Sequence, residues 1–388
     1  MPDSTITAVE LARGAIDSLP EGSLAEKLAE GRPLRVKLGI DPTAADIHLG
    51  HVVVLEKLRQ FQAAGHQIVL IIGDYTARVG DPSGRSTERP VLSGEQIDAN
   101  AATFQEQAFK VLDRDRTEVR LNSEWLDMPS GELFGLARRF TVARLLERDD
   151  FTKRMAAAEP ISILELLYPV MQGYDSVAIA ADIELGGSDQ RFNLLFGRSV
   201  QESFGRPPQA VMTMPILPGT DGKRRMSKSL GNYVGVTDPG PEMFGKLMSV
   251  PDEAMELYWT LLLGEELDRS RHPGEAKRDL AARIVARFHG EGAGREAEAR
   301  FDSVHVHHEI PEDIDVVVIE GAEAHLPALI SAQFGLSSSE ARRMIDQGGV
   351  RLDDDAVTPG KLDFPAADLD GKVLRVGKRR FARLSAPG

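Results

Sequence analysis

Two short apolar runs near the start of the chain flank one amphipathic helix pattern. Leu34–Ile40 and Gln67–Ile72 have the length of buried strands, and Leu49–Gln62 between them carries apolar residues at helical intervals. Strand, helix and strand in this order form a βαβ unit, whose two strands are parallel. The pattern therefore predicts an α/β fold with a Rossmann-like parallel sheet. Further strands are expected near Val119–Leu121 and Val211–Leu217.

The length predicts more than one domain, because 388 residues exceed what one hydrophobic core usually supports. We expect a Rossmann-like catalytic domain over residues 1–236. Strand patterns then stop, and prolines separate helical segments, which predicts an α-helical domain over 237–315. Helix, strand and turn patterns return in a small α+β domain over 322–388.

Composition excludes several classes of site. The chain has no cysteine, which removes disulfides, thiolate nucleophiles and cysteine-based zinc sites and suits the reducing cytoplasm. The N-terminus has neither a basic start nor an apolar stretch, and no apolar run reaches the roughly 18 residues of a membrane span. We expect a soluble, cytoplasmic protein with no membrane partner.

A polar segment follows the first predicted strand and contains Asp41, Thr43, His48, Gly50 and His51. Ligands of an open parallel sheet bind beyond the carboxyl ends of the strands, where a helix N-terminus offers free N–H groups and a positive dipole end. The two histidines, three apart, would share one face of the helix. Glycine between them leaves room for a flat group such as a purine.

A basic loop with the sequence Lys223-Arg-Arg225-Met-Ser227-Lys228-Ser229 follows a predicted turn late in the first domain. Four cations in six residues, beside small hydroxyl residues, suit phosphate binding. No Walker or Gly-x-Gly-x-x-Gly motif occurs in the sequence. Alone, a His-x-x-His pair is more often a satisfied helical pair, and a basic loop is more often solvated surface. Together, His-Leu-Gly-His and Arg-Met-Ser-Lys-Ser resemble the HIGH and KMSKS signatures of class I aminoacyl-tRNA synthetases.

Three intervening segments narrow the resemblance to bacterial tyrosyl-tRNA synthetases: Gly80–Arg85, Tyr168–Asp175 and Gly186–Gln190. The family implies that Asp175 accepts the tyrosine hydroxyl and that Asp81, Tyr168 and Gln172 bind its ammonium group. It also implies that Asp189 binds the ATP ribose, that Gly187 belongs to the ATP site, and that Gln190 lies near the adenylate and Asn122 in the pocket. Without these motifs, Asp175 would be a surface acid and Asp189 a helix cap. Pro169 is expected to start or kink the helix that carries the pocket residues.

Two positions depart from the family pattern. Lys37 stands where many relatives have a tyrosine that contacts the substrate phenol, so either Asp175 works with a different partner or Lys37 turns away. Arg225 stands where the second signature usually has lysine, and its forked guanidinium changes the contacts available to the loop.

The last predicted domain ends in a basic stretch, although the chain carries a net charge of −14. Its final stretch from Gly371 has six basic residues and no acidic one. It resembles an S4-type RNA-binding domain, and its helix has a capping-box spacing at Ser337 and Glu340. A solvated basic strand is the alternative. The expected RNA contacts are Arg342, Arg343, Lys378, Arg379 and Arg380.

The resemblance implies tyrosine activation with ATP, followed by transfer of tyrosine to tRNA(Tyr). Thr43, His48 and His51 would hold the phosphates, and Arg225 and Lys228 would close over the leaving pyrophosphate with Ser227 and Ser229. Mg²⁺ is expected with ATP, since no protein metal site is predicted. The family is generally homodimeric. Three alternatives are a tryptophanyl-tRNA synthetase, a small-molecule nucleotidylyltransferase and a catalytically inactive RNA-binding relative.

Overall fold

The computed structural model describes residues 7–43, 46–79, 93–305, 314–353, 355–377 and 380–386. The chain divides into two compact units, Met1–His289 and Gly290–Gly388. Each is described by itself. The predicted three-domain division at residues 236 and 315 stays a prediction. None of the helices in the described segments is both long and apolar enough to span a membrane.

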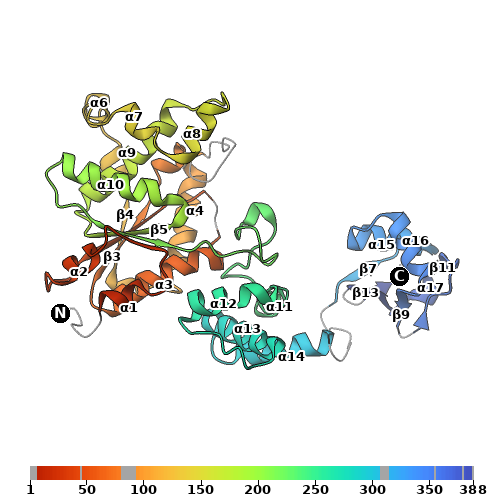
Figure 1. Cartoon of the computed structure of the whole chain (residues 1–388). Helices are drawn as coiled ribbons and strands as arrows, with labels where there is room; N and C mark the ends of the chain where they lie inside the picture. Colours follow the sequence, from red (N-terminus) through yellow and green to blue (C-terminus); the bar gives the residue numbers. More distant parts are fainter. Residues whose placement is uncertain are drawn as a thin grey trace. The chain divides into compact units, whose positions relative to one another are not determined.

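A six-stranded sheet forms the centre of the first unit (Figure 1). Its strand order is β1-β6-β5-β2-β3-β4, and all neighbours are parallel except the edge strand β1, which is antiparallel to β6. The strands are β1 (Asp17–Leu19), β2 (Arg35–Ile40), β3 (Gln67–Ile72), β4 (Thr117–Leu121), β5 (Ile183–Gly187) and β6 (Ala210–Met214). The predicted α/β fold with a parallel sheet is confirmed.

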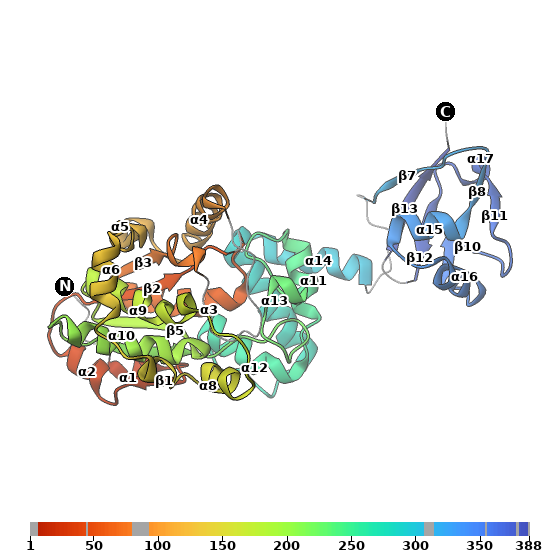
Figure 2. The same ribbon diagram turned by 90° about the horizontal axis from the view of Figure 1, so that it is seen from above.

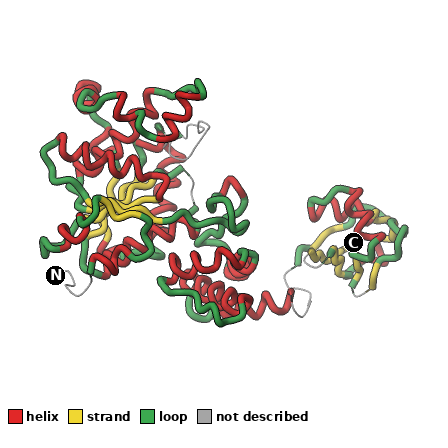
Figure 3. Tube along the Cα trace, in the orientation of Figure 1, coloured by secondary structure: helices red, strands yellow, loops and turns green. Residues whose placement is uncertain are grey.

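Helices cover both faces of this sheet, so its central strands are buried on both sides (Figures 1 and 3). Helix α3 (Leu49–Ala63) lies on one face, and α9 (Ile163–Ala178) and α10 (Arg191–Ser203) lie on the other. Helix α9 begins at the capping box of Ser162 and Glu165, so the prediction that Pro169 starts it is wrong; the proline lies inside the helix.

The remaining helices of the first unit are α1 (Ala8–Ala12), α2 (Ser23–Leu28), α4 (Gly94–Ala108), α5 (Ser123–Leu126), α6 (Ser130–Ala137), α7 (Val142–Leu145), α8 (Asp149–Ala156), α11 (Gly240–Met248), α12 (Met255–Tyr258) and α13 (Pro273–His289). A π-helical turn, Trp259–Leu263, follows α12. Residues 239–289 contain no strand, as their sequence predicts.

The second unit contains α14 (Ala293–His305) and a small α+β module (Figure 2). Its five-stranded sheet has the order β10-β9-β12-β13-β7, formed by β7 (Val316–Val318), β9 (Val350–Leu352), β10 (Asp355–Ala356), β12 (Val373–Val376) and β13 (Arg380–Ser385). Strands β8 (Glu323–His325) and β11 (Asp363–Pro365) pair separately, and the helices are α15 (Leu326–Phe334), α16 (Ser338–Asp346) and α17 (Ala366–Leu369). The predicted capping box of α16 forms, with Ser337 Oγ accepting from the Glu340 amide at 3.2 Å.

Candidate active site

The candidate site lies at the carboxyl ends of β2 and β5, where the order of the sheet reverses. From β2 the chain proceeds outward through β3 and β4, then returns to place β5 on the other side of β2 and continues to β6. Loops that leave β2 and β5 therefore diverge to opposite faces. Such a switch point opens a crevice for ligands in open α/β sheets.

His48 and His51 lie together at the start of α3. His48 is the N-cap, and its Nδ1 accepts from the Gly50 amide at 3.2 Å. The His48 amide in turn donates to Nδ1 of His51 at 3.2 Å. The two rings are stacked with centroids 4.0 Å apart. A side chain at Gly50 would come within 3.0 Å of the His48 ring, so glycine lets the pair stack.

Both imidazoles are neutral near pH 7. Burial lowers the pKa of His48 to about 2, with a further contribution from His51, and burial lowers the pKa of His51 to about 4. Since each Nδ1 accepts a backbone hydrogen bond, the single proton of each neutral ring belongs on Nε2. The pair therefore presents two N–H donors and no formal charge.

The predicted free amide groups at this helix start are not present. Leu49 N donates to the Val234 carbonyl at 3.0 Å, Gly50 N to the His48 ring, and His51 N to the His48 carbonyl at 2.8 Å. That expectation was wrong because the chain caps its own helix with a histidine and with a distant strand-like segment. The histidine Nε2–H groups remain as donors in this turn.

The second signature loop is held beside the first. Val236 N donates to the Ile47 carbonyl at 3.0 Å, the counterpart of the Leu49–Val234 bond. Lys228 pairs with Asp46, and this hydrogen bond raises the pKa of the lysine. Arg225 lies 3.9 Å from a carboxylate oxygen of Asp189. The structure thus joins two motifs that are far apart in the sequence.

A buried asparagine fixes the base of this loop. Asn232 is 3% exposed; its Oδ1 accepts from Ser227 N at 2.9 Å, and its Nδ2 donates to the Arg225 carbonyl and to Asp221, both at 3.1 Å. Ser227 and Ser229 share a hydroxyl hydrogen bond of 3.0 Å. The basic residues therefore project from an ordered turn. Sequence analysis missed this role of Asn232.

Helix α9 contributes the three predicted pocket residues, which are all buried. The Tyr168 hydroxyl donates to Asp41 at 2.9 Å. Gln172 Nε2 donates to Glu184 at 3.2 Å, and its Oε1 accepts from Asn193 at 3.0 Å. Asp41 was predicted only as part of the turn after β2, but its position against the phenol makes it a part of the pocket.

Asp175 is a buried acid, with an exposed fraction of 3%. Burial raises its pKa to about 6, against the opposing effects of the Lys37 charge and of a 2.8 Å hydrogen bond from Trp125 Nε1. The reading of Asp175 as a surface acid is therefore excluded. Trp125 was not predicted, because nothing in its local sequence distinguishes it from a core aromatic residue.

The remaining predicted residues lie in the surrounding loops. Asn122 is buried; its Nδ2 donates to the Thr76 hydroxyl and its Oδ1 accepts from the Tyr75 amide, both at 3.0 Å. Thr43 lies in the loop after β2, where its amide donates to the Asp41 carbonyl. Gly187 ends β5, and Asp189 and Gln190 lie in the short 3₁₀ helix that follows. Asp81 lies outside the described residues.

The predicted RNA contacts lie in the second unit. Arg342 and Arg343 are exposed on α16, and Arg380 is exposed at the start of β13. Hydrogen bonds within the capping box lower the pKa of Glu340, and the charges of Arg343 and Arg380 contribute. Those two cations therefore lie near Glu340. Lys378 and Arg379 lie outside the described residues.

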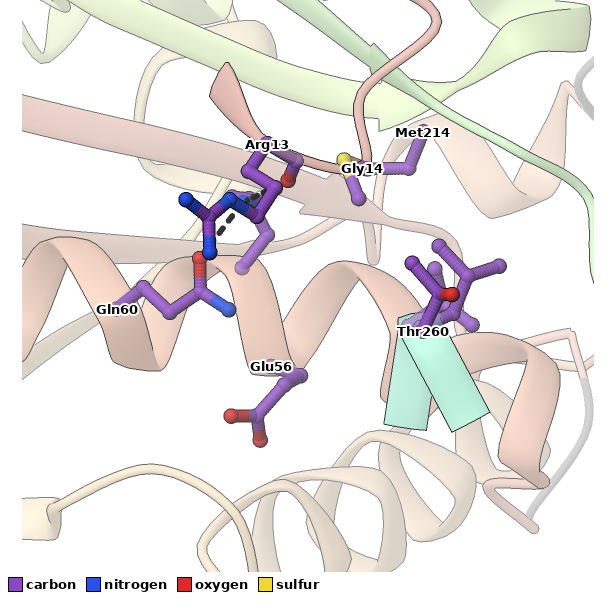
Figure 4. A pocket seen from close by; sticks show the side chains of 9 residues that line it. Arg13, Gly14, Glu56, Gln60, Met214 and Thr260 are labelled. Carbon is purple, nitrogen blue, oxygen red and sulfur yellow. Dashed lines mark hydrogen bonds between the residues drawn. The ribbon is translucent and has the colours of Figure 1, made fainter. Parts of the chain in front are cut away.

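A separate small pocket lies along one side of α3 in the first unit. Figure 4 shows Glu56 and Gln60 projecting from α3, with Arg13 and Met214 opposite. None of the predicted site residues lines it. Within the described part of the chain, no group of three His, Asp or Glu side chains is arranged to hold a metal ion.

Comparisons with known proteins agree with the geometry. A sequence model of the family described as tRNA synthetases class I (W and Y) matches residues 29–305. The tyrosine–tRNA ligase of Moorella thermoacetica is 50% identical, over 96% of this chain and 94% of that protein. The tyrosine–tRNA ligase of Thermotoga maritima is also 50% identical, over 97% of this chain and 96% of its own.

The fold also matches solved structures. A tyrosyl-tRNA synthetase from Archaeoglobus fulgidus, solved with L-tyrosine, has a TM-score of 0.59 and 22% identity, over 74% of this chain and 97% of its own. This likeness concerns the fold alone. The sequence relatives decide between the tyrosine and tryptophan branches of the family model. The chain belongs to the tyrosine–tRNA ligases, within the class I aminoacyl-tRNA synthetases.

Proposed function

We propose that the reaction of this tyrosine–tRNA ligase takes place at the switch point between β2 and β5. There, L-tyrosine and ATP form tyrosyl-adenylate and pyrophosphate, and the tyrosine then passes to the 3′-terminal adenosine of tRNA(Tyr). One observation carries the proposal: Arg225 and Lys228 are held beside the loops of β5 and β2 that carry Asp189 and Asp46. This arrangement gathers cations at the place where the phosphates of ATP must react.

The tyrosine side chain would lie against α9. A phenol donor would give the buried carboxylate of Asp175 a further hydrogen bond beside that from Trp125, and phenylalanine would lose this bond at a cost of about 1–3 kcal/mol. Tyr168 donates its proton to Asp41, which leaves lone pairs of the phenol oxygen to accept from the substrate ammonium. Gln172 Oε1 and Asp81 would complete that ammonium site.

The ATP phosphates would lie at the start of α3. His48 and His51 donate through Nε2–H, Thr43 adds a hydroxyl group, and the dipole of a 15-residue helix favours negative charge at this end. Gly50 would leave space for the adenine, and Asp189 and Gly187 would bind the ribose, with Gln190 beside the adenylate. These groups position reactants rather than react with them.

The chemical step is an in-line displacement. A carboxylate oxygen of tyrosine bonds to the α-phosphorus, the bond to the bridging oxygen breaks, and pyrophosphate leaves with the negative charge. Lys228 and Arg225, with Ser227 and Ser229, would stabilise that developing charge. The exposed Lys228–Asp46 pair is worth little, so phosphate can replace Asp46 easily. Mg²⁺ bound to ATP would neutralise part of the phosphate charge, and the phosphates themselves would be its main ligands.

The test is ATP–pyrophosphate exchange with each of the twenty amino acids in turn. We expect exchange with tyrosine alone, and exchange with none of them would refute the proposal. Lys228→Ala should lower the rate of adenylate formation about 100-fold with little change in tyrosine binding. Lys223→Ala is the matched control, because Lys223 is an exposed lysine of the same loop outside the signature.

For tRNA, we propose that the module over residues 322–388 binds RNA phosphates through Arg342, Arg343, Lys378, Arg379 and Arg380. The helical region 237–315 would contact the tRNA as well. The support is charge: three of these arginines are exposed, and two of them, Arg343 and Arg380, lie near Glu340 in an acidic chain.

We further propose a homodimer and a cytoplasmic location. Five of the large exposed apolar side chains belong to helices α6 to α9, on the side of the unit away from α3 (Figure 1). We call them the apolar patch: Phe134, Val142, Met155, Ile163 and Leu164. A second copy of the chain would cover such a patch by isologous pairing. The absence of cysteine suits a reducing compartment.

A further inference from the structure

Lys37 and Glu184 form an ion pair inside the first unit, on the adjacent strands β2 and β5. Their side chains are 0% and 1% exposed, and Nζ of the lysine lies 2.8 Å from Oε1 of the glutamate. A buried ion pair is often no more stabilising than a well-packed apolar pair, because both charges lose their hydration. The contacts of this ion pair, rather than its contribution to stability, therefore indicate its role.

The lysine ammonium has three hydrogen-bond partners. Besides Glu184, it donates to the Gln172 carbonyl at 2.9 Å and to the Ser176 hydroxyl at 2.8 Å. Lys37 therefore turns toward α9 and binds two successive turns of the helix at residues 172 and 176. Asp175 lies between these two points on the same helix.

Glu184 completes the network from the opposite side. Its Oε1 also accepts from Gln172 Nε2, and its Oε2 accepts from Ser176 at 3.2 Å and from Gln209. The amide of Gln172 is thereby fixed, because its nitrogen faces Glu184 and its oxygen faces Asn193. Removal of either charge would leave the other buried with hydrogen bonds but without the opposite charge of its ion pair.

Asp175 is subject to several neighbouring groups. Lys37 on β2 lowers the pKa of Asp175 and Glu184 on β5 raises it, while Trp125 and Asn122 donate hydrogen bonds to its ionised form. Arg120 on β4 stacks over the Trp125 ring at 5.3 Å and is itself paired with Glu118 and Glu124. Lys37 is thus the buried cation that acts directly on this carboxylate.

We propose that Lys37 and Glu184 are positioning residues for tyrosine selection: Lys37 keeps Asp175 ionised as the acceptor of the substrate phenol, and Glu184 balances that charge while it holds Gln172. The inference rests on the proposed role of Asp175. It also explains how lysine can stand at position 37, where many relatives have a tyrosine. Lys37 acts on Asp175 through its charge and does not contact the substrate phenol.

The experiment measures tyrosine affinity between pH 5 and 8 for the full-length protein and for Lys37→Met, Glu184→Gln and the double variant. The wild-type affinity should fall on acidification with a midpoint near 6. Because the effect of Lys37 on Asp175 exceeds that of Glu184, the midpoints should rise in the order Glu184→Gln, wild type, double variant, Lys37→Met. The last should lie roughly one pH unit above wild type, so tyrosine binds several-fold more weakly at pH 6.5.

Lys57→Met is the matched control. Lys57 is also a buried lysine, 2% exposed. It lies on α3, on the face of the sheet opposite α9, and donates to the carbonyls of Leu11 and Arg13. Burial lowers the pKa of Lys57 to about 8, so the lysine is charged over most of the pH range and the control variant removes a buried charge. It should leave the tyrosine midpoint at the wild-type value.

The results separate this inference from the proposed function. If the wild type catalyses tyrosine-dependent exchange but all the variants share its midpoint, the inference is refuted and the function stands. If the wild type catalyses no exchange, the function itself fails. Should Lys37→Met not fold, Glu184→Gln decides the question, since an unchanged or raised midpoint in that variant contradicts the inference.

Discussion

At the scale of single residues, the proton position on two histidine rings decides which donors the proposed phosphate site offers. His48 and His51 each accept a backbone hydrogen bond at Nδ1, and burial keeps both rings neutral. They would bind phosphate as oriented N–H donors rather than as cations. Positive charge comes instead from Arg225 and Lys228, on the neighbouring signature loop.

The first prediction concerns His51→Gln. Glutamine at this position can accept the His48 amide as in an ordinary capping box, so stability at pH 7 should change by less than about 1 kcal/mol. Glutamine keeps an N–H donor of its own, on a more flexible side chain, so the rate of adenylate formation should fall by less than the roughly 100-fold expected when a donor is removed altogether. Denaturant unfolding and ATP–pyrophosphate exchange measure the two effects.

The same variant tests the depressed pKa of His51. The native ring is neutral down to about pH 4, whereas an unfolded histidine takes up a proton near pH 6.5. Below pH 6.5 the unfolded state binds more protons, so wild-type stability falls as the pH falls. At pH 5 this loss is about 2 kcal/mol, and His51→Gln should be spared it. Equal losses in both proteins between pH 7 and pH 5 would contradict the assignment.

At the scale of elements, one buried side chain, Asn232, orders the second signature loop. Asn232 bonds the backbone at both Ser227 and Arg225 from a buried position. Loss of these hydrogen bonds would leave the segment that carries Arg225 and Lys228 without its buried support. The contacts of α9 would not change. We therefore expect loss of the Asn232 side chain to affect ATP and pyrophosphate rather than tyrosine.

Asn232→Ala should raise KM for ATP about tenfold and lower kcat, while tyrosine affinity stays at the wild-type value. Gln62→Ala is the matched control, because Gln62 is a buried amide that orders another loop. Its Nε2 donates to the carbonyls of Asp113 and Arg116, beside the start of β4. Steady-state kinetics for both substrates measure the difference. Equal changes in KM for ATP in both variants would show that the effect is general destabilisation.

The elements also show why sequence and structure differ at α3. Helical periodicity and the His-x-x-His spacing predict the helix and its place after β2. They do not reveal that Leu49 N is used by the Val234 carbonyl, because that partner comes from a segment distant in the sequence. Likewise, Asp46 and Trp125 have no local pattern that marks them, and only folding brings them to Lys228 and Asp175.

At the scale of the whole molecule, the net charge of −14 conceals two basic sites with different proposed tasks, adenylate formation at the loop and tRNA binding in the second unit. Combining Arg342→Ala, Arg343→Ala and Arg380→Ala should weaken tRNA binding. The slope of log K against log salt should become shallower by about 0.7–0.9 for each phosphate that the protein no longer neutralises. Tyrosine-dependent exchange should be unchanged. Binding titrations at several salt concentrations test this, with the exposed Arg114→Ala as the control.

The apolar patch leads to a prediction about assembly. Leu164→Asp places a charge among exposed apolar side chains, so sedimentation should show a dimer converted to monomer. Val9→Asp is the control, since Val9 is 79% exposed on α1 outside the apolar patch. A Leu164→Asp variant that stays dimeric would place the interface elsewhere.

The sequence by itself determined the parallel sheet, the two signature loops and the identity of the reaction, because strand periodicity and motif spacing are local properties of the chain. Tertiary structure alone decided which donors the phosphate site offers, what holds the catalytic loop, and which way Lys37 turns. Those answers depend on burial and on partners supplied by distant segments. A lysine in a strand has the same sequence whether it faces water or lies, as Lys37 does, fully buried against Glu184.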